Sequence, residues 1–319
     1  MTVHTRFKTL NWRGEGKLGS ILLIVLLLKA QTIWASPVVV TFIKPIHSLI
    51  SGVMEGVGEP VLPFQGSESP HDHTLRPSEV KLIYGADLLV WVGPTLEGFL
   101  IKPLENKDVK AQILTLQSLE GVEWIRTGES IHEENSVEEK DHHHQQGQIN
   151  PHIWLDPQIA QKIVYKVTEI LIHMDSVHRD VYQKNSKIVL NKLRGLEAEL
   201  TKELSPVKNI SFMTFHDAYS YFQKRFDLRG IGSVTLDPER IPGARKISEL
   251  KRKIIKSQAV CVFSEPQFQS KLVKTITEGT AAGTGILDPL GADLQPGGEA
   301  YFLMMYRLKD NLKDCLLRK

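Results

Sequence analysis

Short runs of consecutive apolar residues, each followed by a segment with helical features, recur along this chain. The first runs lie at Val38–Ile43, Val61–Phe64, Asp87–Val92 and Ile113–Leu116. Because they are continuous and rich in β-branched residues, they predict strands buried on both faces, as in a parallel sheet. Helices are expected between them, from about His47 to Val57 and again from an N-cap at Ser78. Alternation of strand and helix predicts an α/β fold with mainly parallel sheets.

A second series of the same kind begins after residue 206. Its expected strands are Ile210–Phe215, Ile231–Leu236, Ala259–Phe263 and Gly285–Leu287. Two helical segments, Pro157–Asp175 and Arg179–Leu204, separate the two series. The second segment carries one apolar stripe at helical spacing, formed by Val189, Leu193, Leu196, Leu200 and Leu204. The predicted parts are an N-terminal α/β lobe (36–177), a long linking helix (178–205) and a C-terminal α/β lobe (206–319).

The charge balance excludes a nucleic-acid-binding class. The 319 residues carry a net charge of +2, but residues 1–35 alone hold five bases and one acid. Without them, 34 bases stand against 36 acids. Nucleic-acid-binding domains are usually strongly basic, so we expect no nucleic-acid partner.

The N-terminal segment predicts export. Four bases precede the apolar run Ile21–Leu28, and the small residue Ala35 follows it, an arrangement typical of a secretory signal peptide. The run is far shorter than the ~20 residues that cross a bilayer, although an uncleaved anchor is the alternative. No cysteine near Ala35 offers a lipid anchor. We therefore expect cleavage after residue 35 and an exported protein without a direct membrane anchor.

A polar stretch at 129–148 interrupts the strand and helix pattern. It is rich in acidic residues and contains four histidines, His132, His142, His143 and His144. With hardly any apolar residue it cannot bury a core, so a mobile loop is expected. Its histidines suggest an accessory, low-affinity collector of metal, and a solvated linker is the alternative.

Four polar residues stand in or beside expected loops and strand ends. His71 lies in the loop after the second expected strand, His152 follows the polar stretch, and His216 and Asp288 stand at expected strand ends. In open α/β sheets, ligands bind beyond the carboxyl ends of strands. Three neutral imidazoles with a carboxylate or a water suit four-coordinate Zn²⁺. The wide separation of these residues in sequence fits a site assembled between lobes, although a single histidine at a strand end is more often a hydrogen-bonded structural residue than a ligand.

The two cysteines, Cys261 and Cys315, are the only ones in the chain. In an exported protein, one pair most simply forms one disulfide. A thiolate metal site is the alternative, but it lacks the close C-x-x-C spacing common in zinc sites.

Several motifs in order resemble one known family. They are KPIHSL at 44–49, SPHDHTLRPS at 69–78, WVGP at 91–94, NPHIWLDP at 150–157, FHDAY at 215–219, IPG at 241–243, FSEPQF at 263–268 and LDPLG at 287–291. Together they resemble the periplasmic zinc-binding proteins of ABC uptake transporters (cluster A-I substrate-binding proteins) over residues 38–315. The resemblance implies two lobes joined by a rigid helix, with the metal in the cleft between them.

The resemblance also implies the metal ligands. The family's three histidines match His71, His152 and His216. At the fourth position some members use a Glu before the first histidine, where this chain has Pro70, and manganese or iron relatives use a carboxylate matching Asp288. Zinc members often leave that position to water, so water or Asp288 is implied here.

Two further positions are compared with the family. His73 stands where the family commonly has tyrosine, which suggests an extra ligand or an altered rim of the site. The family's C-terminal disulfide matches Cys261 and Cys315.

The implied function is high-affinity capture of Zn²⁺ in the periplasm and its delivery to the membrane permease of an ABC transporter, by a monomer that is not an enzyme. One alternative is a manganese- or iron-binding protein of the same transporter type. Another is an exported zinc hydrolase, since three histidines and a water also form a catalytic arrangement. The sequence lacks an H-E-x-x-H or G-x-S-x-G motif that would favour the hydrolase.

Overall fold

The structure, a computed structural model, describes residues 36–64, 68–129, 147–240, 242–268 and 271–318. The expected signal peptide (1–35) and the four loop histidines His132, His142, His143 and His144 lie outside these described residues. Within the described ranges, no helix combines the length and the apolar composition that crossing a bilayer requires.

The first apolar series forms a parallel three-stranded sheet. Its strands, in spatial order, are β1 (Val39–Thr41), β2 (Leu88–Trp91) and β3 (Gln112–Thr115). The helices of this part are α2 (Lys44–Met54), α3 (Pro77–Gly85) and α4 (Ile101–Leu104). Every residue of β1 and β2 is buried, as continuous apolar strands predict.

Three local predictions for this part were wrong in detail. The expected strand at Val61–Phe64 is reduced to a single bridge between Val61 and Val40, since Pro63 supplies no backbone N–H for a longer ladder. Helix α2 begins at Lys44 because Pro45 fits its first turn. Helix α3 has Arg76, not Ser78, as its N-cap residue, because Pro77 opens the helix one residue earlier.

The second series forms a parallel four-stranded sheet in the order β5-β4-β6-β7. Its strands are β4 (Phe212–His216), β5 (Gly230–Thr235), β6 (Cys261–Ser264) and β7 (Gly283–Ile286). Its helices are α7 (Ser220–Phe226), α8 (Ala244–Lys256), α9 (Lys271–Thr277) and α10 (Ala300–Leu316). A disulfide joins Cys261 in β6 to Cys315 in α10, as predicted.

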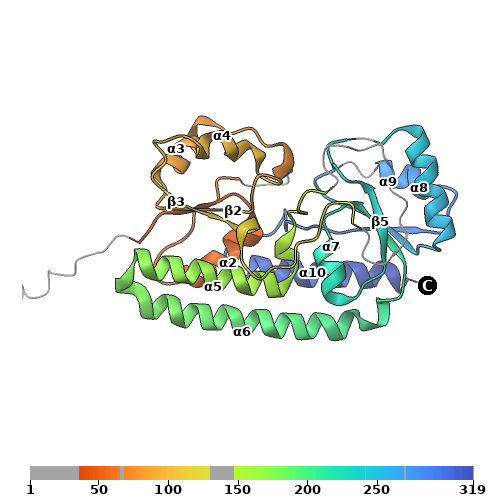
Figure 1. The fold of residues 1–319 in the computed structure, drawn as a ribbon. Coiled ribbons are helices and arrows are strands. Elements are labelled where there is room, and N and C mark those ends of the chain that lie inside the picture. Colours follow the sequence, from red (N-terminus) through yellow and green to blue (C-terminus); the bar gives the residue numbers. More distant parts are fainter. Residues whose placement is uncertain (1–35, 65–67, 130–146, 241, 269–270, 319) are drawn as a thin grey trace, which may run out of the picture. The chain divides into compact units, whose positions relative to one another are not determined.

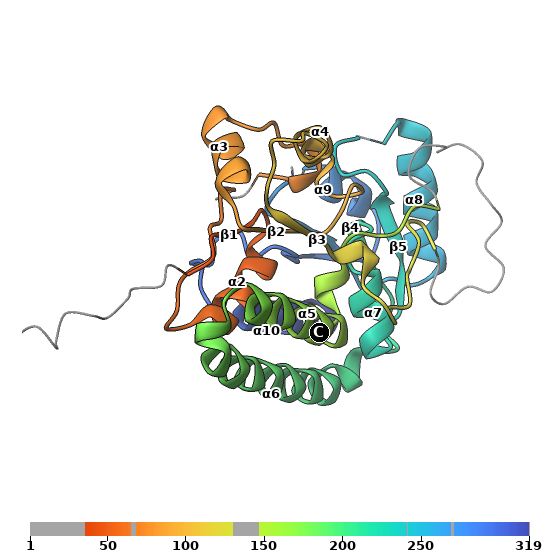
Figure 2. The same cartoon turned by 60° about the vertical axis from the view of Figure 1, so that its left-hand side comes forward.

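Helices α5 (Pro157–Met174) and α6 (Arg179–Leu204) connect the two sheets along the chain. Figures 1 and 2 both show them on one side of the sheets together with α10. Helix α6 packs against α2 and α5 near the first sheet and against α7 and α10 near the second. All five leucine and valine positions of the predicted stripe on α6 are buried, so the prediction of a long helix that joins the two sheets is confirmed.

Short 3₁₀ turns supply the remaining helical structure. They are η1 (Pro70–Asp72), η2 (Gly98–Leu100), η3 (Leu116–Ser118), η4 (Ile153–Leu155), η5 (Ser176–His178) and η6 (Ser205–Val207). Two of them, η1 and η4, adjoin candidate ligands.

The largest apolar core runs without interruption from the first sheet to the second. It joins Leu88 and Val90 of β2 to Leu193 and Leu200 of α6 and to Phe263 of β6. Burying a leucine side chain contributes roughly 1.5–3 kcal/mol, so this shared core resists separation of the two sheets. Residues 36–319 accordingly form one compact unit, and the lobe boundaries at 177 and 205 stay a prediction.

Candidate metal centre

Three imidazoles from distant parts of the chain converge between the two sheets. His71 lies in η1, His152 directly precedes η4, and His216 is the last residue of β4. Their potential ligand nitrogens all lie within 4.8 Å of one another. The ring centroids are 4.9 Å apart for His152 and His216, and 5.4 and 5.7 Å from His71 to those two rings. The structure therefore brings together the three histidines that the sequence proposed.

The side chain of Asn150 fixes the ring of His152. Its Nδ2 donates to the carbonyl of Asp217 at 2.6 Å, and its Oδ1 accepts the backbone N–H of His152 at 3.1 Å. The same Oδ1 lies 2.9 Å from His152 Nδ1. Because an amide oxygen only accepts, Nδ1 must carry the proton, which leaves the Nε2 lone pair of His152 free.

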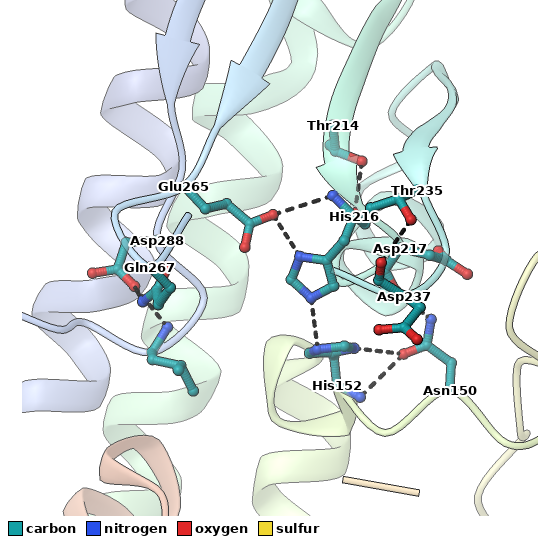
Figure 3. Close-up of polar contacts among 11 residues, drawn as sticks. Asn150, His152, Thr214, His216, Asp217, Thr235, Asp237, Glu265, Gln267 and Asp288 are labelled. Carbon is teal, nitrogen blue, oxygen red and sulfur yellow. Dashed lines mark hydrogen bonds and ion pairs between the residues drawn. The ribbon is translucent and has the colours of Figure 1, made fainter. Parts of the chain in front are cut away.

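Glu265 does the same for His216. It follows β6 directly, and its Oε1 lies 2.7 Å from His216 Nδ1. The carboxylate accepts the Nδ1 proton, so the Nε2 lone pair of His216 is also free. Such an outward N–H bond to a carboxylate or amide is how proteins orient metal-binding histidines. Figure 3 shows the resulting row of contacts from Glu265 through His216 and His152 to Asn150.

The two free lone pairs face each other at close range. His152 Nε2 and His216 Nε2 are 3.1 Å apart with no proton assigned between them. In a tetrahedral zinc site with Zn–N bonds of about 2.0–2.1 Å, two ligand nitrogens are about 3.3 Å apart. The pair is thus spaced for a cation held between the rings, which would also relieve the repulsion of the lone pairs.

Burial keeps the imidazoles of His71 and His152 neutral. Desolvation, with a smaller contribution from His216, lowers the pKa of His71 to about 3. Desolvation first, then His216 and His71, lowers the pKa of His152 well below its ordinary value. Neutral imidazole is the form that binds a metal, because a proton would occupy the same lone pair.

The His152 segment is anchored on residues from the second half of the chain. Trp154 Nε1 donates to the carbonyl of Pro289 at 2.7 Å, and the hydroxyl of Tyr301 donates to the carbonyl of Trp154 at 2.8 Å. Arg225 holds Asp156 through two hydrogen bonds of 2.8 and 2.7 Å. The His152 segment is therefore held by residues from the second half of the chain, which also supplies His216, whereas His71 lies in η1 in the first half.

A pocket opens at the three imidazoles. Its other lining residues are Ser69, Pro70, Trp154, Glu265, Gln267, Phe268, Pro289 and Leu290. Two buried atoms of these residues, Glu265 Oε2 and Gln267 Oε1, have no hydrogen-bond partner among the described residues. An unpaired buried polar atom is costly, so both atoms suit a hydrogen bond to a group bound in the pocket.

Asp288 lies outside the group of converging ligand atoms. Its Oδ1 accepts hydrogen bonds from Gln267 Nε2 at 2.9 Å and from the backbone of Leu290 at 3.0 Å. Its Oδ2 accepts from the backbone of Ala292 at 2.6 Å. Figure 3 shows this carboxyl group beside Gln267 and apart from the imidazoles. Its place as a metal ligand stays a prediction.

Two other histidines take structural positions. His47 is buried in α2, and its Nε2 lies 3.0 Å from the carbonyl of Pro60. His73 is not among the converging ligands; its Nε2 lies 3.0 Å from Oε2 of Glu79.

Asp72 and Asp217, which directly follow His71 and His216 in the sequence, differ in position. Asp72 is exposed. Asp217 is partly buried, and desolvation raises the pKa of its carboxyl group. It supports His152 through Asn150, whose Nδ2 donates to the backbone carbonyl of Asp217.

The orienting roles of Asn150 and Glu265 were not predicted from the sequence. Both belong to recognised motifs, NPHIWLDP and FSEPQF, and Glu265 stands at a strand end. A search for hydrogen-bonding side chains at the ends of neighbouring parallel strands would have found Glu265, because such ends lie at one edge of the sheet.

Proteins that are similar to this chain are described as zinc-uptake or zinc-bound proteins. Residues 38–315 match the family described as zinc-uptake complex component A, periplasmic. The chain is 39% identical over 304 residues to the high-affinity zinc uptake system protein ZnuA of Brucella abortus, covering 87% of this chain and 91% of that protein. The ZnuA protein of Yersinia pestis is 33% identical over 294 residues, covering 88% and 92%. A zinc(II)-bound variant of AdcAII from Streptococcus pneumoniae has a similar structure, with a TM-score of 0.71 and 26% identity over 88% of this chain and 99% of that one.

Two parallel sheets, a long helix beside both and a metal-binding histidine triad between them define a metal-ion-binding protein with the cluster A-I substrate-binding fold. The fold class expected from the sequence is confirmed. The chain belongs to the ZnuA family, the periplasmic component of zinc-uptake complexes. This family consists of transport binding proteins and is not enzymatic.

Proposed function

We propose that this protein captures Zn²⁺ in the periplasm with high affinity and delivers it to the membrane permease of an ABC transporter. The observation that carries the proposal is the convergence of three imidazoles whose potential ligand nitrogens all lie within 4.8 Å of one another. Membership of a zinc-uptake family supports the identity of the cargo.

The ligands in this proposal are His71, His152 and His216, with water in the fourth position. Asp288 is the less favoured fourth ligand, because its two oxygens already accept three hydrogen bonds from its own neighbourhood. The unpaired Oε2 of Glu265 would accept a hydrogen bond from the bound water. A site with three protein ligands and one exchangeable position is also suited to cargo that must leave again.

The donor set favours zinc over manganese. Imidazole nitrogen suits Zn²⁺, whereas carboxylate and water oxygen suit Mn²⁺. Manganese or iron binding would need Asp288 to turn into the pocket and give up its present hydrogen bonds. Membership of a family of transport proteins argues against the hydrolase alternative.

The remaining parts of the proposal concern the rest of the chain. Residues 1–35 are proposed to be a cleaved export signal, and the histidines of loop 129–148 an accessory collector of metal. The protein is proposed to act as a monomer, with the N-terminal lobe (36–177) and C-terminal lobe (206–319) contacting the permease on either side of the site.

A competitive titration tests the function. Metal-free protein comprising residues 36–319 is titrated with Zn²⁺ against a chelator of known affinity, and the titration is repeated with Mn²⁺. One tight zinc site with much weaker manganese binding is expected. Preference for Mn²⁺ would favour an Asp288-containing site, and failure to bind either metal tightly would contradict the uptake function.

A further inference from the structure

His71 is held differently from the other two ligands. The rings of His152 and His216 are each fixed by a hydrogen bond at Nδ1. Within the part of the chain that the structure describes, no hydrogen bond reaches the ring of His71, and its backbone N–H donates to Ser69 Oγ at 3.3 Å. Its position therefore depends on how the short segment that carries it is anchored.

The anchor on one side is His73, two residues further along. Its side chain is only 4% exposed. The rings of Phe64 and Phe99 flank it, each with its centroid 4.9 Å away and nearly perpendicular to the imidazole. Phe99 in turn contacts Phe42, just after β1, at 5.5 Å. The side chain of His73 therefore packs among aromatic residues of the apolar cluster beside the first sheet.

Glu79 fixes the orientation of the His73 ring. Its side chain is 5% exposed, and its Oε2 lies 3.0 Å from His73 Nε2. The same oxygen accepts the backbone N–H of Arg76 at 2.7 Å, at the start of α3. By accepting both hydrogen bonds, the Glu79 carboxylate connects the segment that carries His71 and His73 to the start of α3. His73 is also 3.8 Å from Glu68, but that carboxylate is 60% exposed and such pairs contribute little.

We propose that the buried His73–Glu79 pair is a positioning device that holds His71 over the other two imidazoles and so sets how fast the site releases its metal. This proposal rests on the metal-capture function proposed above. Two residues of chain span at most about 7 Å, so fixing His73 leaves His71 little freedom. When the pair is broken, His71 can swing away and leave the metal on two imidazoles, from which it dissociates faster.

The chemistry of the pair is more specific than packing requires. The space between two phenylalanine rings would accept an apolar side chain without the cost of burying an imidazole and a carboxylate. A hydrogen bond, unlike an apolar contact, fixes direction as well as distance. The polar pair therefore serves to place the segment that carries His71.

The test compares release rates among matched variants. His73→Phe keeps an aromatic side chain between the two phenylalanine rings but removes the hydrogen bond to Glu79. Glu79→Gln keeps an oxygen that can accept hydrogen bonds from both His73 and Arg76. Ile83→Val, in the buried face of α3, perturbs the same helix without touching the ligand segment. Zinc-loaded proteins are mixed with excess chelator in a stopped-flow instrument, and thermal midpoints are recorded in parallel. We expect release at least tenfold faster for His73→Phe, about unchanged for Ile83→Val, and close to the unsubstituted protein for Glu79→Gln.

A double-mutant cycle separates positioning from general stability. In a His71→Ala background, His73→Phe should produce no further acceleration, because the ligand through which it acts is gone. Equal acceleration in both backgrounds, or an unchanged rate for His73→Phe alone, would overturn the proposal. Failure of the capture function looks different, because the unsubstituted protein would then bind no zinc tightly, and the positioning role would fall with it.

Discussion

Glu265 is expected to raise zinc affinity through its charge as well as through its hydrogen bond. Its Oε1 lies 2.7 Å from His216 Nδ1. Adding the width of the imidazole ring and a Zn–N bond of about 2 Å places the metal about 7 Å from that oxygen. At an effective dielectric constant of about 20, a unit negative charge and a doubly charged ion at this distance attract by about 5 kcal/mol.

That Coulomb energy is an upper limit, because part of it is offset by desolvation of the carboxylate. Loss of groups that orient metal ligands typically costs 10–100-fold in metal affinity. We therefore expect Glu265→Gln, which keeps the accepting oxygen but removes the charge, to weaken zinc binding about 10–100-fold. Glu265→Ala should weaken it further, because the Nδ1 proton then has no acceptor and the tautomer of His216 is no longer fixed.

The assay is the competitive chelator titration, with circular dichroism to verify folding. Glu105→Gln, a loss of the same charge from an exposed position at the end of α4, is the matched control and should leave affinity unchanged. Zinc binding by Glu265→Gln as tight as that of the unsubstituted protein would refute the electrostatic argument. Equal weakening by Gln and Ala would refute the tautomer argument.

Four further outcomes are expected. His216→Ala should weaken high-affinity zinc binding at least tenfold in the same titration, and unchanged affinity would remove it from the ligand set. Deletion of 132–146 should leave that affinity nearly intact; a comparable loss would instead make the loop part of the tight site. Burial raises the pKa of Glu97 to about 8 from an unfolded value of 4.5, so the folded state binds more protons between these values and stability falls as pH rises through that window. Thermal midpoints should therefore decline from pH 4.5 to 8 less steeply in Glu97→Gln than in the unsubstituted protein, and parallel profiles would contradict this assignment. Reducing the Cys261–Cys315 disulfide, which closes a loop with a sequence separation of 54, should cost about 4 kcal/mol in the chain-entropy model, measured by denaturant unfolding; an unchanged unfolding midpoint would show that the loop is restrained by other contacts.

The histidine triad could be predicted because the motifs of the resembling family include all three residues. Strand position supported only His216, which ends β4, where a parallel sheet presents side chains at one edge. The partner of each ring could not be predicted, because it depends on which strands become neighbours. Glu265 reaches His216 only because β6 pairs with β4, and strand order is not written in any single segment.

The errors at element ends have local causes. Pro45 and Pro77 open helices, since the missing N–H is not needed in a first turn, and this moved both helix starts away from their predicted positions. The role of His73 was also beyond sequence reasoning, because a histidine two residues from a ligand invites a metal-binding interpretation. The position of Glu79 in the structure is what shows where the ring of His73 points.

The anchoring of His152 has a consequence for the order in which the molecule can be made. Asn150, Trp154 and Asp156 are held by Asp217, Pro289, Tyr301 and Arg225, all of which are synthesised much later than His152. A chain that emerges from its N-terminus can form the first sheet early, but His152 then lacks its support and His216 is not yet present. The full set of contacts that hold the His152 segment can therefore form only after the chain has been made as far as Tyr301.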